Sequence, residues 1–325
     1  METKQRYYPP ATTRSSLMLQ VASSLVAERE WRYRQAKVTL REQGGHGPEV
    51  CFFGDDSPGG IEAVGRGEVH IATVNPATVL ALAARGKGPF KKPLPLRTIA
   101  VVPSLDQLGF AVSQESGLTS LYDIRKRRYP LKLSLRGQKN HSIHIVVKEV
   151  LAAVGTSIED ILAWGGRISY DEGNMDDPHG FRARVAAVKR GETDAIFDEA
   201  LNLWVNLASE SGMRFLSLED SLLKELEALG LRRGTIEKAE FSKLPRDVTT
   251  IDFSGWPVYT LASAPDELIT SFCRGLMESR DSIPWQGEGP LPLERMCRDT
   301  PEGPLAVPLH SAAERFWREC GYLSK

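Results

Sequence analysis

Residues 132–155 read KLSLRGQKNHSIHIVVKEVLAAVG, and this stretch predicts a strand, a polar loop and a long helix in succession. The first four residues alternate between polar and apolar side chains, as in a strand with one buried face. From Ile143 to Val154 the apolar residues recur at helical spacing, and Gly155 supplies a stop. Asn140 and Ser142 are both candidate N-caps of this helix.

The start of this helix is the first candidate binding site. The N–H groups of a first helical turn lack partners within the helix and lie at the positive end of its dipole. If the helix start faces a cleft, Asn140, His141 and Ser142 are placed to bind an anionic group. An ordinary strand–helix unit, whose cap satisfies only its own backbone, explains the same residues.

Length and composition are typical of a soluble globular protein with about two domains. Of the 325 residues, 41% are hydrophobic and 26% are charged. The net charge of −1 argues against a nucleic-acid-binding protein, which would carry a basic excess. No run approaches the ~18 apolar residues of a membrane span. We therefore expect neither a nucleic-acid partner nor a membrane-spanning segment.

The N-terminal sequence, METKQRYYPPATTRSS, lacks the apolar core and the small-residue cleavage site of a signal peptide. We therefore expect a cytoplasmic protein. A periplasmic protein is the alternative if the true start lies upstream.

The sequence predicts neither a metal site nor a cofactor. The four cysteines are widely scattered and form no CxxC pair, so we expect reduced thiols and no zinc. Acidic residues gather in the loop at 170–180, but they lack the spacing of a calcium-binding loop.

Polar residues at the ends of several predicted elements in the first third are further candidates. A helix is expected over 14–29, and Arg14 at its start, beside Ser15, could clamp a carboxylate bidentately or lie solvated beside a serine cap. Ser57 lies in a glycine-rich loop. Asn75 follows a buried strand at 69–74 and begins the next helix.

The second half adds an acidic pair and an aromatic residue. The buried strand TDAIF is followed by Asp198 and Glu199, which could accept a ligand ammonium, serve as an acid or base, or stabilise the next helix through its dipole. Residues 217–246 are expected to form a charged helical segment. Trp256 could stack on a ligand or pack in the core.

Four motifs in order resemble the TAXI family of solute receptors, the binding proteins of one class of tripartite (TRAP) transporters. The motifs are GRGEVHIATVNPATVLALAARG, then LRTIAVVP with GFAVSQESGLTSLYDIRKRRYPLKLS, then TDAIFDEA, then PLHSAAERFWRECG. The resemblance covers residues 14–322. His70, Lys126 and Ser311 stand where the family usually has aspartate, glycine and proline.

The resemblance implies an α/β protein with the type 2 periplasmic-binding-protein fold, in which two lobes are joined by two crossover strands. The first lobe would comprise residues 1–112 and 256–325, and the second, inserted lobe residues 113–255. A ligand would lie between the lobes, at the carboxyl ends of the strands.

The leading function is noncatalytic binding of a small, carboxylate-bearing solute in that cleft. The helix start at 140–142 would bind the anion, with Arg14, Ser57 and Asn75 around it. A membrane permease is the expected partner if the protein is exported. The alternative is a cytoplasmic enzyme that acts on an aromatic carboxylate, similar to a dihydroxyphthalate decarboxylase, with His141, His144 and Glu199 as candidate catalytic residues. A ligand-sensing domain for a cytoplasmic partner is a third possibility.

Overall fold

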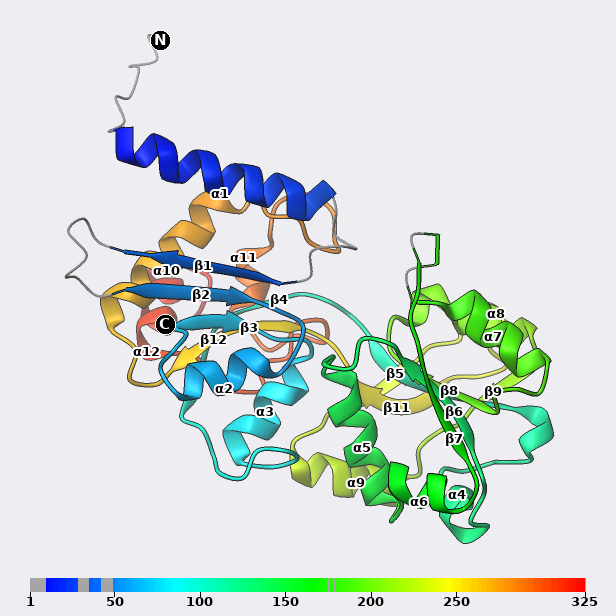
Figure 1. Cartoon of the computed structure of the whole chain (residues 1–325). Helices are drawn as coiled ribbons and strands as arrows, with labels where there is room; N and C mark the ends of the chain where they lie inside the picture. The colour runs from blue at the N-terminus through cyan, green and yellow to red at the C-terminus, as the bar shows by residue number, and fades with distance from the viewer. Residues whose placement is uncertain (1–9, 29–34, 42–48, 175, 178, 325) are drawn as a thin grey trace.

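The computed structural model describes residues 10–28, 35–41, 49–174, 176–177 and 179–324. The chain forms two α/β lobes, each built around one β-sheet, with helices packed on both faces of the sheet (Figure 1). This is the fold class that the sequence predicts, and two crossover segments join the lobes.

The first lobe contains a five-stranded mixed sheet. Its strand order is β1 (Ala36–Leu40), β2 (Val50–Gly54), β3 (Ile71–Thr73), β12 (Trp256–Leu261) and β4 (Leu96–Val102). Strands β2 and β3 are parallel, and the other neighbours are antiparallel. The carboxyl ends of β2 and β3 therefore lie at the same edge of the sheet, where candidate loops begin.

Two groups of helices cover the first sheet. Apolar side chains of α2 (Gly59–Gly65) and α3 (Ala77–Arg85) join the main hydrophobic core. A second cluster comes from α10 (Asp266–Ser279), α11 (Leu293–Met296) and α12 (Ser311–Glu319), and Trp317 of α12 is fully buried there. Helix α3 is followed by Gly86, whose φ of 64° is left-handed, so the glycine ends the helix.

The second lobe contains a seven-stranded sheet. Its order is β10 (Arg233–Ile236), β11 (Val248–Asp252), β5 (Gln107–Ser113), β8 (Ala195–Asp198), β6 (Lys132–Arg136) and β7 (Arg167–Asp171), and β9 (Met213–Phe215) also pairs with β5. Strands β6, β7 and β8 are parallel, so their carboxyl ends share one edge.

The helices of the second lobe are short, apart from the one that the opening stretch predicts. They are α4 (Tyr122–Lys126), α5 (Ile143–Ala153), α6 (Ile158–Ala163), α7 (Phe181–Lys189), α8 (Val205–Glu210) and α9 (Asp220–Leu229), with 3-10 turns η1 (Gln114–Ser116) and η2 (Leu201–Leu203). Helix α5 buries Val146, Val147 and Val150 in the main core, as its spacing predicts.

The two crossovers lie side by side. Residues 103–106 join β4 to β5, and residues 253–255 join β11 to β12. Ser254 donates a hydrogen bond of 2.9 Å from Oγ to the Asp106 carbonyl, and the Gly255 N–H donates one of 2.9 Å to the Ser104 carbonyl. Each crossover is therefore held by the other.

The chain passes from the first lobe to the second earlier than at the predicted residue 112. Strand β5 pairs with β8 from Gly109 opposite Asp198 to Val112 opposite Ala195, and so belongs to the second sheet. The crossover is consequently at 103–106. Helix α12 packs with α10 and β4 on the first lobe.

The expectation of a helix throughout 217–246 is wrong. Helix α9 ends at Gly230, whose φ of 113° breaks the helix, and β10 then pairs with β11. The charged residues of this segment belong to an exposed helix face and an edge strand.

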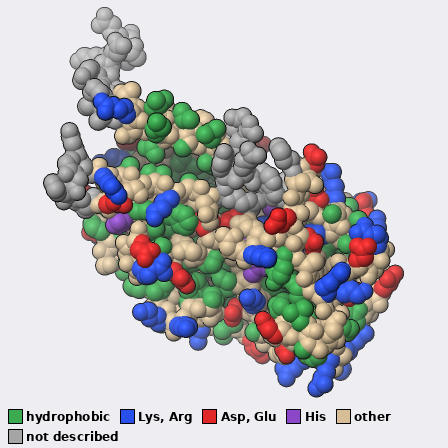
Figure 2. Space-filling view, in the orientation of Figure 1, with side chains coloured by type: hydrophobic (Ala, Val, Ile, Leu, Met, Phe, Trp, Pro, Cys, Tyr) green, Lys and Arg blue, Asp and Glu red, His purple; other side chains and the backbone are tan. Residues whose placement is uncertain are grey.

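Helix α1 (Pro10–Glu28) forms where the sequence predicts a helix, but its apolar side chains are exposed. Figure 2 shows them on the surface of the first lobe, whereas lysines, arginines and carboxylates are interspersed over the rest of that face. None of the helices among the described residues has the length and apolar character to cross a bilayer.

Candidate functional site: an interlobe cleft with two cavities

The loops that follow β2 and β6 meet between the lobes. Ser142 donates a hydrogen bond of 3.0 Å from Oγ to the Asp56 carbonyl, and Gln138 donates one of 2.8 Å from Nε2 to the Asp56 carboxylate. Two cavities flank this bridge, and both have Asp55 and His141 in their linings. The cleft expected at the carboxyl ends of the strands is therefore present, in two parts.

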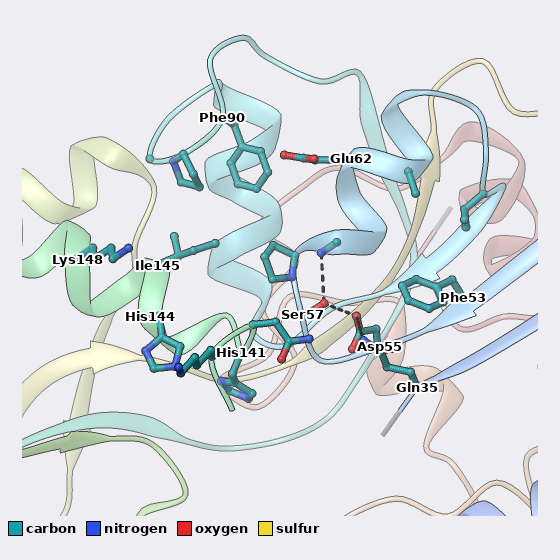
Figure 3. Close-up of a pocket in the computed structure, with 18 of the residues that line it drawn as sticks. Gln35, Phe53, Asp55, Ser57, Glu62, Phe90, His141, His144, Ile145 and Lys148 are labelled. Carbon is teal, nitrogen blue, oxygen red and sulfur yellow. Dashed lines mark hydrogen bonds between the residues drawn. The ribbon is translucent and has the colours of Figure 1, made fainter. Parts of the chain in front are cut away.

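The first cavity has a volume of about 860 Å³ and lies between α2 and α5 (Figure 3). Much of its wall is apolar, with side chains from both lobes: Phe53, Pro58, Ala63, Val69, Pro89, Phe90 and Ile145. A volume of this size accommodates a small organic ligand.

Two lysine side chains on the α5 side of the first cavity carry positive charge. Lys139 and Lys148 line it, and neither forms an ion pair within the described part of the chain. His144 lies beside them, with Nε2 3.0 Å from the Gln138 carbonyl oxygen, and burial lowers the pKa of His144. The imidazole is thus neutral at pH 7, and on this side of the cavity the two lysines carry the positive charge.

The carboxylates that line the first cavity are largely engaged or shielded. Asp55 accepts hydrogen bonds from Gln35 Nε2, at 3.0 Å, and from the Ser57 hydroxyl. Burial raises the pKa of Glu149, which favours its neutral form. Glu62 faces the cavity in Figure 3, and its carboxylate lies 3.6 Å from Arg66 Nη1.

The second cavity has a volume of about 750 Å³ and borders the first crossover. Its lining is more polar, and most of its charged side chains are acidic. These charged residues are Asp55, Asp56, Asp106, Arg136, Glu199 and Glu240, and the polar Asn75 lies with them.

A buried charge network supports one wall of the second cavity. Arg136, at the end of β6, contacts Asp198 with Nη2 3.0 Å from Oδ1 and also pairs with Glu199. Arg184 of α7 pairs with the other oxygen of Asp198 at 2.5 Å. Although burial raises the pKa of Asp198, the charges of Arg136 and Arg184 lower it more, so its pKa is below the usual range. The network holds Glu199 in place at the cavity.

Asp106 brings a further carboxyl to Glu199 from the crossover. It accepts hydrogen bonds from the N–H groups of Ala200, at 2.7 Å, and Gln107, at 2.8 Å. Burial raises the pKa of Asp106 well above its ordinary value, and the neighbouring Glu199 raises it further. Asp106 therefore keeps its proton to a higher pH than an ordinary aspartate does.

The start of α5 does not offer the free backbone N–H groups that the predicted anion site requires. The N–H of His141 donates to the Gln138 carbonyl, and the N–H of Ile143 donates to His141 Nδ1 at 3.2 Å. Ser142 is fully buried in the interlobe bridge, whereas Asn140 lines the first cavity. The first-turn amides thus have internal partners, and the positive charge comes from lysine side chains.

The other predicted residues divide between the cavities. Ser57 lines the first cavity, whereas Asn75, Glu199 and Trp256 line the second. Asp198 is buried behind Glu199. Arg14 and Ser15 lie on α1, exposed and outside both linings, because α1 precedes the sheet and does not reach the cleft.

The three candidate catalytic residues do not converge on one cavity. His144 lines the first cavity, Glu199 lines the second, and His141 borders both. Glu199 is also paired with Arg136. The three residues are therefore divided between the two cavities.

Arg136 and Arg184 were not predicted as site residues, although the local sequence pattern around each is a signal of burial. Arg136 follows Ser134 at strand period on a buried strand, and Arg184 shares a helix face with Phe181 and Val188. A charged residue at an inward position calls for a buried partner. Asp106, Lys139 and Lys148 give no such signal, because loops and exposed helix faces commonly carry charge.

The acidic loop has structural roles. Asp177 accepts hydrogen bonds from the N–H groups of Phe181 and Arg182 at the start of α7, and Asp171 accepts one from Ser134. Within the described ranges, no three histidine, cysteine or carboxylate side chains lie close enough to hold a metal ion.

The profile of the NMT1-like family matches residues 57–321. None of the curated proteins matches the chain. Among solved structures, the tungstate-binding protein TupA from Desulfovibrio alaskensis G20 is 11% identical over 86% of this chain and 94% of its own, with a TM-score of 0.35. The glycine betaine/L-proline-binding protein ProX from Borrelia burgdorferi is 9% identical over 68% of this chain and 71% of its own, with a TM-score of 0.36.

Proposed function

Because this chain belongs to the NMT1-like family, we propose that it binds a small, carboxylate-bearing solute with an apolar body, without catalysis, in the first cavity of the interlobe cleft. The observation that carries the proposal is the position of Lys139 and Lys148. Both line an apolar-walled cavity, and neither has an ion-pair partner among the described residues.

Each part of such a ligand has a counterpart in the cavity. A carboxylate would pair with the lysine ammonium groups from the second lobe, and Asn140 offers an amide donor beside them. The apolar body would pack against Phe53 and Phe90 of the first lobe. Because one ligand contacts both lobes, its binding stabilises the closed arrangement.

The test is titration calorimetry with matched acids and amides. Phenylacetate and phenylacetamide have nearly the same shape, but only the acid carries a charge. We expect measurable binding of the acid and at least about tenfold weaker binding of the amide, because one charged hydrogen bond contributes roughly 1.5–3 kcal/mol.

A pair of variants locates the charge that is recognised. Lys148→Gln should weaken phenylacetate binding about tenfold. Lys126→Gln changes the net charge by the same amount on α4, outside the first cavity, and should leave binding unchanged. Equal affinity for acid and amide, or no effect of Lys148→Gln, would show that these lysines do not select the ligand.

The finer assignment is part of the same proposal: a TAXI-type receptor that delivers its solute to a membrane permease. The order of the four motifs between residues 65 and 321 supports it. The cellular location separates this role from that of a cytoplasmic binding protein. Fractionation of cells that express the full gene would recover a receptor of this type from the periplasm, and a cytoplasmic protein from the soluble cytoplasmic fraction.

A further inference from the structure

The second cavity has an excess of acidic side chains over basic ones. Five of its lining residues carry carboxyl groups, against a single guanidinium from Arg136, and these acidic residues are Asp55, Asp56, Asp106, Glu199 and Glu240. The first cavity, in contrast, presents lysines. The two cavities therefore favour ligands of opposite charge.

Arg136 is not available to balance this excess. Its guanidinium is buried between Asp198 and Glu199, which are themselves buried. Asp106 has backbone N–H partners from Ala200 and Gln107, but no cation forms an ion pair with it within the described part of the chain. The side-chain interaction of Asp106 with Glu199 places two carboxyl groups in contact at the cavity wall.

A further acceptor in the same lining lacks a partner. The Oδ1 atom of Asn75 is buried and accepts no hydrogen bond from a described residue. A buried amide oxygen without a donor costs free energy, which a bound donor would recover. This second observation is independent of the carboxyl groups, and it also indicates a ligand that donates hydrogen bonds.

The rest of the wall suits an organic body. Trp256 and Phe241 line the cavity, and Leu105 and Leu203, which are 53% and 51% exposed, approach it from the crossover and from the second lobe. A volume of about 750 Å³ exceeds what a bare metal ion needs, and the described residues contain no metal-ligand cluster. An aromatic face also attracts a cation.

We propose that the second cavity is a separate binding site for an organic ammonium ion, whose charge lies against Asp106 and Glu199 and whose apolar body packs against Trp256. Asn75 Oδ1 accepts a hydrogen bond from the ammonium group. The site lies in the same cleft as the carboxylate site but uses a different set of charged residues.

Calorimetry with amines and neutral analogues tests this site. The probes are 2-phenylethylamine and cadaverine, with 2-phenylethanol and 1,5-pentanediol as their uncharged counterparts. We expect at least one of the two amines to bind, with at least tenfold higher affinity than its uncharged counterpart. Failure of both amines to bind, or equal binding of amine and alcohol, would overturn the proposal.

Variants separate this site from the first cavity. Asp106→Asn removes the charge but keeps an oxygen that can accept the backbone N–H groups, and it should weaken amine binding about tenfold. Glu240→Gln, at an exposed position, should weaken it about twofold. Lys148→Gln is the matched control in the other cavity and should leave amine binding unchanged.

Phenylacetate binding by the same variants distinguishes the carboxylate site from the ammonium site. Phenylacetate binding should be weakened about tenfold by Lys148→Gln and left unchanged by Glu240→Gln. If amines bind but neither Asp106→Asn nor Glu240→Gln weakens them, the ammonium site lies elsewhere and the assignment is wrong, whatever the outcome for carboxylates.

Discussion

Ser142 donates a hydrogen bond of 3.0 Å from its Oγ to the backbone carbonyl of Asp56, and this bond joins the two lobes. Gln138 contributes a second bond to the Asp56 carboxylate at 2.8 Å. Both run between loops that follow strands of different sheets. The lobes are thus held together at the point where the two cavities meet, independently of any ligand.

Loss of this bond should favour separation of the lobes. Ser142→Ala removes one interlobe hydrogen bond, and we expect the open-to-closed ratio to rise about fivefold for a loss of roughly 1 kcal/mol. Small-angle X-ray scattering of the ligand-free protein should then give a larger radius of gyration. Ser209→Ala is the control, because the Ser209 hydroxyl is buried without a hydrogen-bond partner among the described residues. An equal radius for both variants would contradict the role of the bridge.

The buried charge network should stabilise the second lobe strongly. Asp198→Asn leaves Arg136 and Arg184 without their shared carboxylate, and removal of one partner from such a network costs about 3–5 kcal/mol. Urea denaturation monitored by circular dichroism measures this loss.

The same network predicts a pH dependence. The pKa of Asp198 is lowered in the folded protein, so its stabilising contribution is present above the unfolded pKa of about 3.9. It is lost as the pH falls through the folded pKa. The difference in stability between the wild type and Asp198→Asn should therefore be constant near pH 7 and shrink below about pH 4. A difference that grows on acidification would contradict the assignment.

Amine binding in the second cavity should release a proton. The pKa of Asp106 is raised in the folded protein by burial and by Glu199, so a bound cation favours its ionised form and displaces the proton. Glu199 and Arg136 face Asp106 from β8 and β6, and Asp55, Asp56, Glu240, His141 and His179 share the cavity. Calorimetry in phosphate and in Tris at the same pH should give different observed heats. Equal heats in the two buffers would show that no proton is exchanged.

Gly109 allows β5 to pass beneath an aromatic cluster. A Cβ atom at this position would lie 2.9 Å from Trp204 Cζ2 and 3.0 Å from Leu201 Cδ2. Gly109→Ala should destabilise the protein by about 1–3 kcal/mol through overpacking. Gly275→Ala, within α10 and with no atom within 4 Å, should instead stabilise it by about 0.5–1 kcal/mol. Thermal denaturation of the two variants should give melting temperatures shifted in opposite directions.

Local patterns were sufficient to predict much of the fold. The stretch 132–155 forms β6 and α5 because its apolar residues follow first the strand period and then the helix period. The failure at 217–246 has a simple cause: the edge strand β10 is specified by pairing with β11, a contact that the local pattern does not show.

The site was predicted less well, because its groups come from distant parts of the chain. Asn75, Glu199 and Trp256 were each recognised at an element end and line one cavity. Ser57 lines the other cavity. The separation of the two cavities depends on a hydrogen bond between residues 56 and 142, which no spacing in the sequence reveals. The backbone amides at the start of α5 were expected to bind an anion, but the N–H groups of His141 and Ile143 donate to partners within this segment.

Hydrogen–deuterium exchange with and without phenylacetate tests the central claim most directly, because it locates the bound ligand in both lobes at once. We predict slower exchange in peptides that cover residues 55–63 and 139–149, with no change at residues 199–203, which line the second cavity and not the first. Protection confined to one lobe, or found only outside these segments, would contradict ligand binding in the first interlobe cavity.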